Sequence, residues 1–282
     1  MNESDINRVG SHISDARFKR LSAFIEKEIG IKMPDTKRSM IESRLQKRLR
    51  VLHMKSLDQY IDSVFSGNDV ELVHMINVIT TNKTDFWREP DHFDLLVSRL
   101  LPTMRLALGE NHSYSFWSAG CATGEEPYTL AMVLEEYGVS NPGFNYRIVA
   151  SDISTSALDV ALSGVYQASK VLPVPLSYRK KYLLRSRDPQ RDEVRVKKDL
   201  RDKISFLRLN FMDSSFPFDG VFDVIFCRNV IIYFDRPTQE RLLSTMCRYL
   251  PLGGHLILGH SETLTGMNLP LHSVAPTVYK RV

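Results

Sequence analysis

The segment Phe116-Trp-Ser-Ala-Gly120-Cys-Ala-Thr-Gly124-Glu-Glu-Pro-Tyr128 decides the fold of this 282-residue chain. Apolar residues with β preference run up to Ala119, a turn of small residues follows, and a helix begins at Glu125. Proline suits the first helical turn because the amide hydrogen it lacks would have no intrahelical partner there. The segment predicts a strand, a glycine turn and a helix, which together let a nucleotide-like ligand approach the backbone.

The charge of this turn indicates which ligand it suits. Gly120 and Gly124 are separated by three residues, so the Gly-x-Gly-x-x-Gly fingerprint of NAD-binding sites is absent. Glu125 and Glu126 would repel a pyrophosphate, whereas they suit an adenosyl ligand that carries a ribose and a cationic group. We therefore favour S-adenosylmethionine over NAD. Acids in a first helical turn also complement the helix dipole without any ligand, and this alternative remains open.

Polar side chains end the next three predicted strands. Runs of β-type residues lead to Asp152, to Asn210 and, through Cys227, to Asn229. Ligands of open α/β sheets bind at the carboxyl ends of the strands, where an acid after the second strand can accept both ribose hydroxyls. We expect Asp152 in that role and Asn210 near the adenine edge. Such residues also cap strand ends, but four in chain order, counting Glu126, favour a ligand site.

Five motifs follow one another along the chain. They are 80–89 (TTNKTDFWRE), 120–128 (GCATGEEPY), 150–153 (ASDI), 226–235 (FCRNVIIYFD) and 259–262 (GHSE). In this order they resemble the motifs of the chemotaxis receptor glutamate O-methyltransferases, the CheR family, and the resemblance runs from about Phe18 to Tyr279. It implies an α/β fold: a Rossmann-like class I S-adenosylmethionine-dependent methyltransferase domain, a small N-terminal all-helical domain and an inserted antiparallel β-subdomain.

The resemblance also implies the reaction and its residues. Methyl groups would pass from S-adenosylmethionine to glutamate side chains of methyl-accepting chemotaxis receptors, forming the methyl esters of sensory adaptation and leaving S-adenosylhomocysteine. Arg88 and Tyr233 would lie beside the transferred methyl, and Asn82 and Thr84 would close over the methionine end and the adenine. The implied cofactor-binding set is Asn82, Thr84, Arg88, Glu126, Asp152, Asn210, Phe211, Asn229 and Val230.

The implied substrate explains why few catalytic groups are needed. A glutamate side chain has a pKa of about 4.3 and is already an anion at pH 7, so the enzyme must supply alignment rather than a general base. Arg88 could hold the carboxylate through its planar fork, or it could form a surface ion pair with Glu89 or Asp91. Tyr233 could donate a hydrogen bond near the reacting atoms, or simply precede the helix predicted from Pro237. We expect no metal site, and we interpret His255 and His260 as structural.

The first part of the chain predicts helices. Apolar residues recur at helical spacing over 18–29, 57–65 and 72–79, and Gly30 and Pro34 end the first of these segments. We therefore predict a helical domain over 12–80 and a methyltransferase domain over 81–282. The polar and aromatic segment 80–89 is expected over the cofactor crevice.

Basic residues gather between Lys37 and Arg50. Ile41, Leu45 and Leu49 recur at i, i+4 and i+8, which predicts one buried helical face. On another face Arg44, Lys47 and Arg48 fall together. With Arg38 they form the predicted substrate-docking ridge, since the resemblance implies a receptor helix rich in glutamates. A solvated helix face without a partner is the alternative.

A second insertion is predicted over about 168–202. The helix after Asp152 ends near Gly164 and the next sheet strand starts near Ile204, a separation too long for a plain loop. Val194-Arg-Val-Lys alternates as a strand does. By resemblance this β-subdomain grips the receptor's C-terminal peptide in some family members. The turn 185–189 (RSRDP) lacks the glycines of those members, so a charged structural hairpin remains an equal alternative.

Composition limits the remaining classes. Hydrophobic residues make up 43% and charged residues 25% of the chain, and no apolar run approaches the roughly 18 residues of a membrane span. Three cysteines without metal spacing and a polar N-terminus predict a cytoplasmic protein. A net charge of +4 is too small to indicate nucleic acid. We expect a monomer without membrane insertion.

Two rival functions remain. A nucleic-acid or small-molecule methyltransferase is one, but 228–231 (RNVI) lacks the Pro-Pro loop usual in base amino-methyltransferases. A catalytically idle docking module is the other, and the set of Asn82, Thr84, Arg88 and Tyr233 argues against it, because a pure binder does not need these residues.

Overall fold

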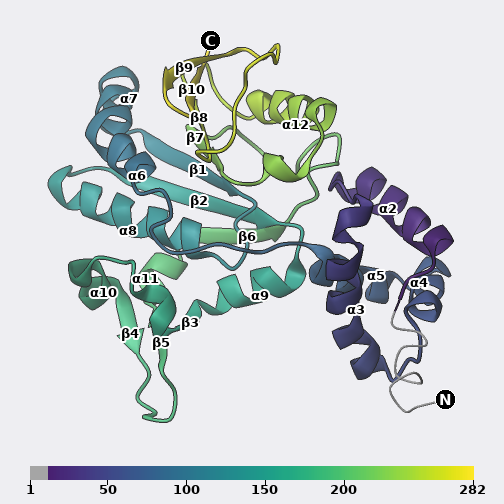
Figure 1. Cartoon of the computed structure of the whole chain (residues 1–282). Helices are drawn as coiled ribbons and strands as arrows, with labels where there is room; N and C mark the ends of the chain where they lie inside the picture. Colours follow the sequence, from purple (N-terminus) through teal and green to yellow (C-terminus); the bar gives the residue numbers. More distant parts are fainter. Residues whose placement is uncertain (1–11) are drawn as a thin grey trace. The chain divides into compact units, whose positions relative to one another are not determined.

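The computed structural model describes residues 12–282, which divide into two compact units (Figure 1). Within these residues the first unit comprises 12–81 together with the short segments Asn210–Met212 and Tyr233–Thr238. The second comprises Asn82–Leu209, Asp213–Ile232 and Gln239–Val282. The continuous part of the first unit ends at Thr81, and the two short segments have no sequence signal that assigns them to the helical unit.

The first unit is helical because its apolar residues recur at helical spacing. Ile41, Leu45 and Leu49 are buried together on one face, as their spacing predicts. Gly30 ends the first helix with φ 74°, a left-handed conformation that glycine adopts without strain. The helices are α2 (Asp15–Ile29), the 3₁₀ turn η1 (Asp35–Lys37), α3 (Arg38–Leu52), α4 (Leu57–Phe65) and α5 (Asp69–Ile79).

The second unit is built on a sheet that has seven strands within the described residues. The strand order is β6-β2-β1-β7-β8-β10-β9. The first five are parallel, whereas β10 runs antiparallel to both of its neighbours. Parallel strands need crossover connections, and helices lie in most of them, although the described segment between β6 and β7 contains none. The strands are β1 (Ser113–Ala119), β2 (Asn145–Asp152), β6 (Ile204–Arg208), β7 (Val224–Cys227), β8 (His255–Leu258), β9 (Leu271–Ala275) and β10 (Val278–Arg281).

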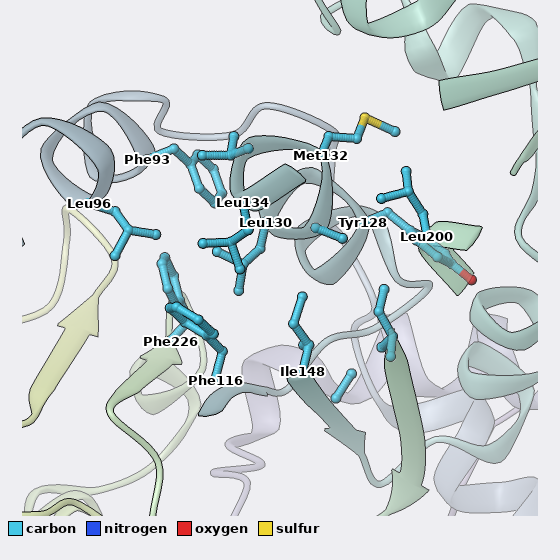
Figure 2. Packing of buried hydrophobic residues seen from close by; sticks show 14 of the residues in the cluster. Phe93, Leu96, Phe116, Tyr128, Leu130, Met132, Leu134, Ile148, Leu200 and Phe226 are labelled. Carbon is cyan, nitrogen blue, oxygen red and sulfur yellow. The ribbon is translucent and has the colours of Figure 1, made fainter. Parts of the chain in front are cut away.

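Helices flank this sheet, and its core explains the apolar run of β1. Successive strand residues face opposite sides of a sheet, so Phe116 and Trp117 can both be fully buried only because both faces of the sheet are covered. Phe116 belongs to the cluster of Figure 2, in which the rings of Phe93 and Phe226 stack at 5.8 Å. The helices are α6 (Asp91–Leu95), the π-helix η2 (Leu96–Leu100), α7 (Leu101–Leu108), α8 (Glu125–Ser140), α9 (Thr155–Ser163), the 3₁₀ turn η4 (Ile231–Tyr233) and α12 (Arg236–Arg248).

The insertion contains a small antiparallel sheet in the order β3-β5-β4, which extends away from the main sheet in Figure 1. It begins at Val165, three residues before the predicted start, because β3 follows directly on the Gly164 cap of α9. Its short helices escape sequence prediction since they are too short to show a periodic pattern. The elements are β3 (Val165–Gln167), the 3₁₀ turn η3 (Ala168–Val171), α10 (Leu176–Tyr182), β4 (Leu183–Arg185), β5 (Glu193–Val196) and α11 (Lys198–Arg201).

Across residues 12–282, every helix is too short or too polar to cross a membrane.

Candidate functional site

Asp152 lies at the carboxyl end of β2 and organises the turn that follows β1. Its Oδ2 accepts a hydrogen bond from the Ala122 N–H at 2.8 Å, and its Oδ1 accepts one from the Ser154 N–H at 2.9 Å. Burial raises the pKa of Asp152, and these backbone N–H groups oppose that rise. Each carboxylate oxygen keeps a further lone pair, so Asp152 can shape the turn and still accept ligand hydroxyls.

The turn after β1 leaves no room for a side chain at Gly120. The N–H groups of Gly120 and Cys121 both donate to the Ser151 carbonyl, at 2.8 and 2.9 Å. Gly120 has φ 78°, and a Cβ built on it would lie 2.5 Å from Cγ2 of Val230. Ala122, with φ 47°, also adopts the left-handed region that glycine favours. The turn therefore requires glycine at position 120, and Val230 packs directly against it.

Glu126 stands in the first turn of α8, close to the end of β1. Its Oε1 accepts a hydrogen bond from the Ser118 hydroxyl at 2.7 Å, and its Oε2 lies 3.6 Å from Nε of Arg228. Burial raises the pKa of Glu126, and the Arg228 charge opposes this. The helix start thus presents a carboxylate to the strand ends, as the sequence predicts.

Arg228 is a buried residue of this region that the sequence did not single out. Its side chain is only 1% exposed, and Nη2 lies 3.3 Å from Oε2 of Glu89. Nη2 also donates to the carbonyl of Arg88, and the guanidinium carbon lies 5.3 Å from the centre of the Phe93 ring. Arginine is rarely buried unless it is paired, so its position directly after the apolar strand β7 was the signal that could have revealed it.

Glu262 holds the turn that follows β7. Its carboxylate, in a residue 5% exposed, accepts hydrogen bonds from four backbone N–H groups at 2.6–2.9 Å. The donors are Gly259, Asn229, Val230 and Ile231. These bonds hold Asn229 at φ 58°, with its Nδ2 donating to Oε1 of Glu89 at 3.2 Å. Glu262 of the motif 259–262 (GHSE) therefore holds the backbone of Asn229 and Val230, two of the predicted cofactor residues.

The segment before α6 carries three more of the predicted site residues. Asn82 donates from Nδ2 to the hydroxyl of Ser154, the N-cap of α9, at 3.1 Å. Thr84 is half-buried, and the half-buried Arg88 donates from Nη1 to the Lys83 carbonyl at 3.2 Å.

The ion pairs considered for Arg88 are absent from residues 12–282. Glu89 pairs with Arg228 and His92 instead, and Asp91 pairs with His260. Trp87 and Glu89, on either side of Arg88, have φ 59° and 51°, so the backbone beside Arg88 is strained.

Comparison with known proteins places this geometry in a family. The family model described as CheR methyltransferase, SAM binding domain, matches residues 82–280, and the model of the CheR all-alpha domain matches 16–80. The chain belongs to the CheR methyltransferase family. The family confirms the fold class and the cofactor S-adenosylmethionine predicted from the sequence, and it makes the chain a methyltransferase.

Curated relatives of this CheR-family chain match most of its length. The chemotaxis protein methyltransferase of Borreliella burgdorferi is 39% identical over 274 residues, which cover 96% of this chain and 95% of the relative. The protein of the same name from Escherichia coli strain K12 is 37% identical over 268 residues, covering 95% and 91%. A solved magnesium protoporphyrin IX methyltransferase from Synechocystis PCC 6803 covers 94% of both chains at 11% identity and a TM-score of 0.36, too low to carry an argument.

Three predicted site residues of the CheR-family chain belong to the first unit. Asn210 donates from Nδ2 to the Glu28 carbonyl at 2.7 Å and accepts from the Met212 N–H at 3.1 Å. The carbonyl of Tyr233 accepts from the Lys32 N–H at 3.0 Å. The roles of Asn210, Phe211 and Tyr233 at the cofactor or the methyl stay predictions.

The basic residues of α3 in this CheR-family chain have structural contacts of their own. Arg44 donates from Nη1 to the carbonyls of Ile79 and Thr80, at 2.7 and 3.0 Å, and so satisfies the last turn of α5. Arg38 donates from Nη1 to Oδ1 of Asp15 at 2.5 Å. Arg48 pairs with the buried Glu71, and only Lys47 of the predicted ridge is exposed. Docking by this ridge stays a prediction, and Lys47 is its most accessible member.

Proposed function

We propose that this chain transfers the methyl group of S-adenosylmethionine to glutamate side chains in the cytoplasmic part of chemotaxis receptors, forming methyl esters. The relatives support the receptor class, because both are named chemotaxis protein methyltransferases. The observation that carries the proposal is the row of carboxylates around the glycine turn, with Asp152 at the end of β2 and Glu126 at the start of α8.

The donors and acceptors at this turn fit the cofactor. Asp152 can accept the two ribose hydroxyls with the lone pairs that its backbone donors leave. Glu126 and Glu89 place two carboxylates beside the guanidinium of Arg228, and the charge of Arg88 also acts on Glu126. The methyl of S-adenosylmethionine is carried by a sulfonium cation, which these carboxylates can face.

Arg88 is the residue we assign to positioning the substrate carboxylate. It is half-exposed and makes one hydrogen bond, from Nη1 to the Lys83 carbonyl, which leaves other guanidinium N–H groups for a ligand. A glutamate of the receptor is already ionised at neutral pH, so alignment and exclusion of water are the tasks left to the protein. Tyr233 is assigned by resemblance to the hydrogen bond beside the reacting atoms.

The β-subdomain offers a surface for the receptor's C-terminal peptide. Strand β4 pairs only with β5 among the described strands, so its other edge can accept an added strand. A groove of about 610 Å³ lies against it, lined by the apolar residues Leu172, Leu183 and Val194 and by three basic residues, Arg179, Lys180 and Arg185, with one acid, Asp192. A basic groove suits an acidic or carboxyl-terminal peptide. A charged structural hairpin remains the alternative. Removing the C-terminal tail of the receptor separates the two, because the KM for the receptor would rise only if the β-subdomain binds that tail.

The test of the main proposal is transfer of labelled methyl to a receptor cytoplasmic fragment, followed by mild base. Base-labile label released as methanol, and lost when the fragment's methylation-site glutamates become alanine, is the expected result. Label that resists base would mean methylation of nitrogen or carbon and would overturn the ester. The fragment without its tail, assayed in parallel, reports on the β-subdomain separately.

A further inference from the structure

Three potential metal ligands meet where α6 begins and β8 ends, although they are far apart in sequence. One ligand atom from each of Glu89, His92 and His260 lies within 4.8 Å of the others. We propose that these side chains form a binding site for a divalent transition metal ion of the zinc class. Glu89 uses its other oxygen, Oε1, to accept from Asn229, so this carboxylate would join the metal site to a predicted cofactor residue.

The spacing of two ligand atoms already suits zinc. Nδ1 of His92 lies 3.5 Å from Oε2 of Glu89. Tetrahedral zinc with bonds of about 2.0–2.1 Å separates its ligand atoms by roughly 3.3 Å. The third ligand, His260, has a side chain that is 50% exposed, and a small shift of its ring together with its partner Asp91 would bring it into bonding distance. The rings of His92 and His260 already lie 4.8 Å apart.

Each proposed ligand has an outer partner that fixes its orientation. The Nε2 of His92 lies 2.8 Å from the Thr277 hydroxyl, and the Nε2 of His260 lies 3.0 Å from Oδ2 of Asp91. Metal-binding histidines characteristically hold their second ring nitrogen in this way, and a carboxylate–histidine pair is a common form. On the carboxylate, Oε1 of Glu89 accepts from Nδ2 of Asn229, which leaves Oε2 for an ion.

Two of the ligand atoms are buried and make no hydrogen bond within the described residues, although both take part in ion pairs. Within residues 12–282, neither Nδ1 of His92 nor Oε2 of Glu89 has a hydrogen bond, although His92 is only 2% exposed. Buried polar atoms are nearly always hydrogen-bonded, so two facing atoms that have only longer ion-pair contacts leave room for a ligand. One metal ion would satisfy both at once.

The positive charge of Arg228 would repel a metal ion bound at Glu89. Its Nη2 lies 3.3 Å from the same Oε2 of Glu89. Arg228 would keep its contacts with Glu126 and with the Arg88 carbonyl if the metal took that oxygen. Glu89, Asp91 and Glu126 outnumber this one cation, so the surroundings favour a divalent ion.

The ligand set selects the class of metal. Two imidazoles and one carboxylate suit zinc and its neighbours, whereas magnesium and calcium prefer oxygen ligands alone. Three protein ligands leave a fourth position for water. A bound ion would join the strained segment that carries Arg88 to the loop after β8.

The test is a calorimetric titration of the full-length protein with zinc chloride, after a chelator has removed any bound metal. We expect one ion per chain, and cobalt(II) in its place should give the strong visible absorption of a tetrahedral site. The variant His260→Ala should bind zinc at least ~10-fold more weakly, and Asp91→Asn should weaken it about 10-fold through the outer partner. His260 is exposed, so its removal should leave the fold intact.

The matched control is His272→Ala, which removes an exposed histidine outside the cluster and should keep the wild-type affinity. Absence of a stoichiometric site in the wild-type protein, or equal affinity in His260→Ala and wild type, would overturn the proposal. These readouts need no methyl transfer, so they stand or fall separately from the proposed function.

Discussion

Arg48 and Glu71 form a two-pronged ion pair inside the helical unit, with Nε–Oε1 at 2.8 Å and Nη2–Oε2 at 2.7 Å. The Tyr60 hydroxyl donates to the same carboxylate at 2.9 Å. The Glu71 side chain is only 7% exposed, and the hydrogen bond from Arg48 holds its pKa below the usual range. Arg48 therefore joins α3 to α5 rather than standing free on the surface.

Removing one partner of this pair should destabilise the protein. We expect Arg48→Ala to lower the free energy of unfolding by about 2–4 kcal/mol, because it leaves Glu71 buried without its counter-charge. Denaturant unfolding measures this. The control Arg50→Ala, at an exposed position of the same helix, should stay within about 0.5 kcal/mol of wild type. Equal effects of the two substitutions would contradict the structural role of Arg48.

Receptor docking is better tested at the exposed cations of α3. Reversing charge at Arg44 or Arg48 would also break contacts within the unit, whereas Lys47 and Arg50 are exposed. We expect Lys47→Glu with Arg50→Glu to raise KM for the receptor fragment several-fold, more at low salt, and to leave cofactor affinity unchanged. Lys27→Glu on α2 is the control. An unchanged KM would mean that the ridge is solvated surface.

The ribose assignment predicts a loss of cofactor affinity in Asp152→Asn. An amide keeps the shape but loses a charged acceptor, and its NH₂ group meets a backbone N–H donor. We expect S-adenosylmethionine to bind about 10–100-fold more weakly, the equivalent of a charged hydrogen bond. Calorimetry on the variant measures this, with the exposed Asp159→Asn as control. Wild-type affinity in Asp152→Asn would remove the ribose assignment.

Glu262→Gln should destabilise the turn after β7. Four backbone N–H groups converge on the carboxylate, and glutamine offers one carbonyl oxygen in place of two. We expect a loss of about 1–3 kcal/mol of unfolding free energy, with weaker cofactor binding as Asn229 and Val230 shift. The exposed neighbour gives the control Ser261→Ala, which should change little. If Glu262→Gln is as stable as the wild type, the second carboxylate oxygen does not contribute to the stability of the turn.

Stability should fall in mild acid partly because of His255. Burial lowers the pKa of His255 to about 4, and the charge of Lys280 adds to this. The unfolded chain, with a pKa near 6.5, takes up the proton first, so the contribution of this residue to stability is present above pH 6.5 and is lost as pH falls towards 4. The slope from one proton is at most about 1.4 kcal/mol per pH unit.

Denaturant unfolding between pH 7 and 4 tests this dependence. We expect a shallower slope in His255→Gln than in wild type, and a wild-type slope in the control His53→Gln at an exposed position. Parallel curves for His255→Gln and wild type would show that His255 takes no part in acid sensitivity.

Much of the fold could be predicted because local patterns and tertiary packing agree. The run before Gly120 became β1, and the spacing of Ile41, Leu45 and Leu49 became the buried face of α3. Positions that depend on contacts distant in sequence could not be predicted. Glu262 reaches back to Asn229, and Asn210 joins the helical unit through Glu28, neither of which has a local signal.

The basic ridge and the metal expectation show the same limit. The spacing of the basic residues on α3 could not reveal that Arg44 satisfies the carbonyls of α5. The sequence indicated no metal cluster because His260 lies far along the chain from Glu89 and His92, and only the fold brings the three together. Partners across the fold decide whether a charged residue is free.

Four residues near the predicted cofactor site have a left-handed backbone conformation, which limits the substitutions that these positions tolerate. Trp87, Glu89, Ala122 and Asn229 all have positive φ, between 47° and 59°. β-branched residues are strained in that region, so valine, isoleucine or threonine at these four positions would distort the backbone. Efforts to accept other methyl donors should vary positions such as Glu126 and Val230, and glycine is the first substitution to try at Ala122, since it would relieve strain there.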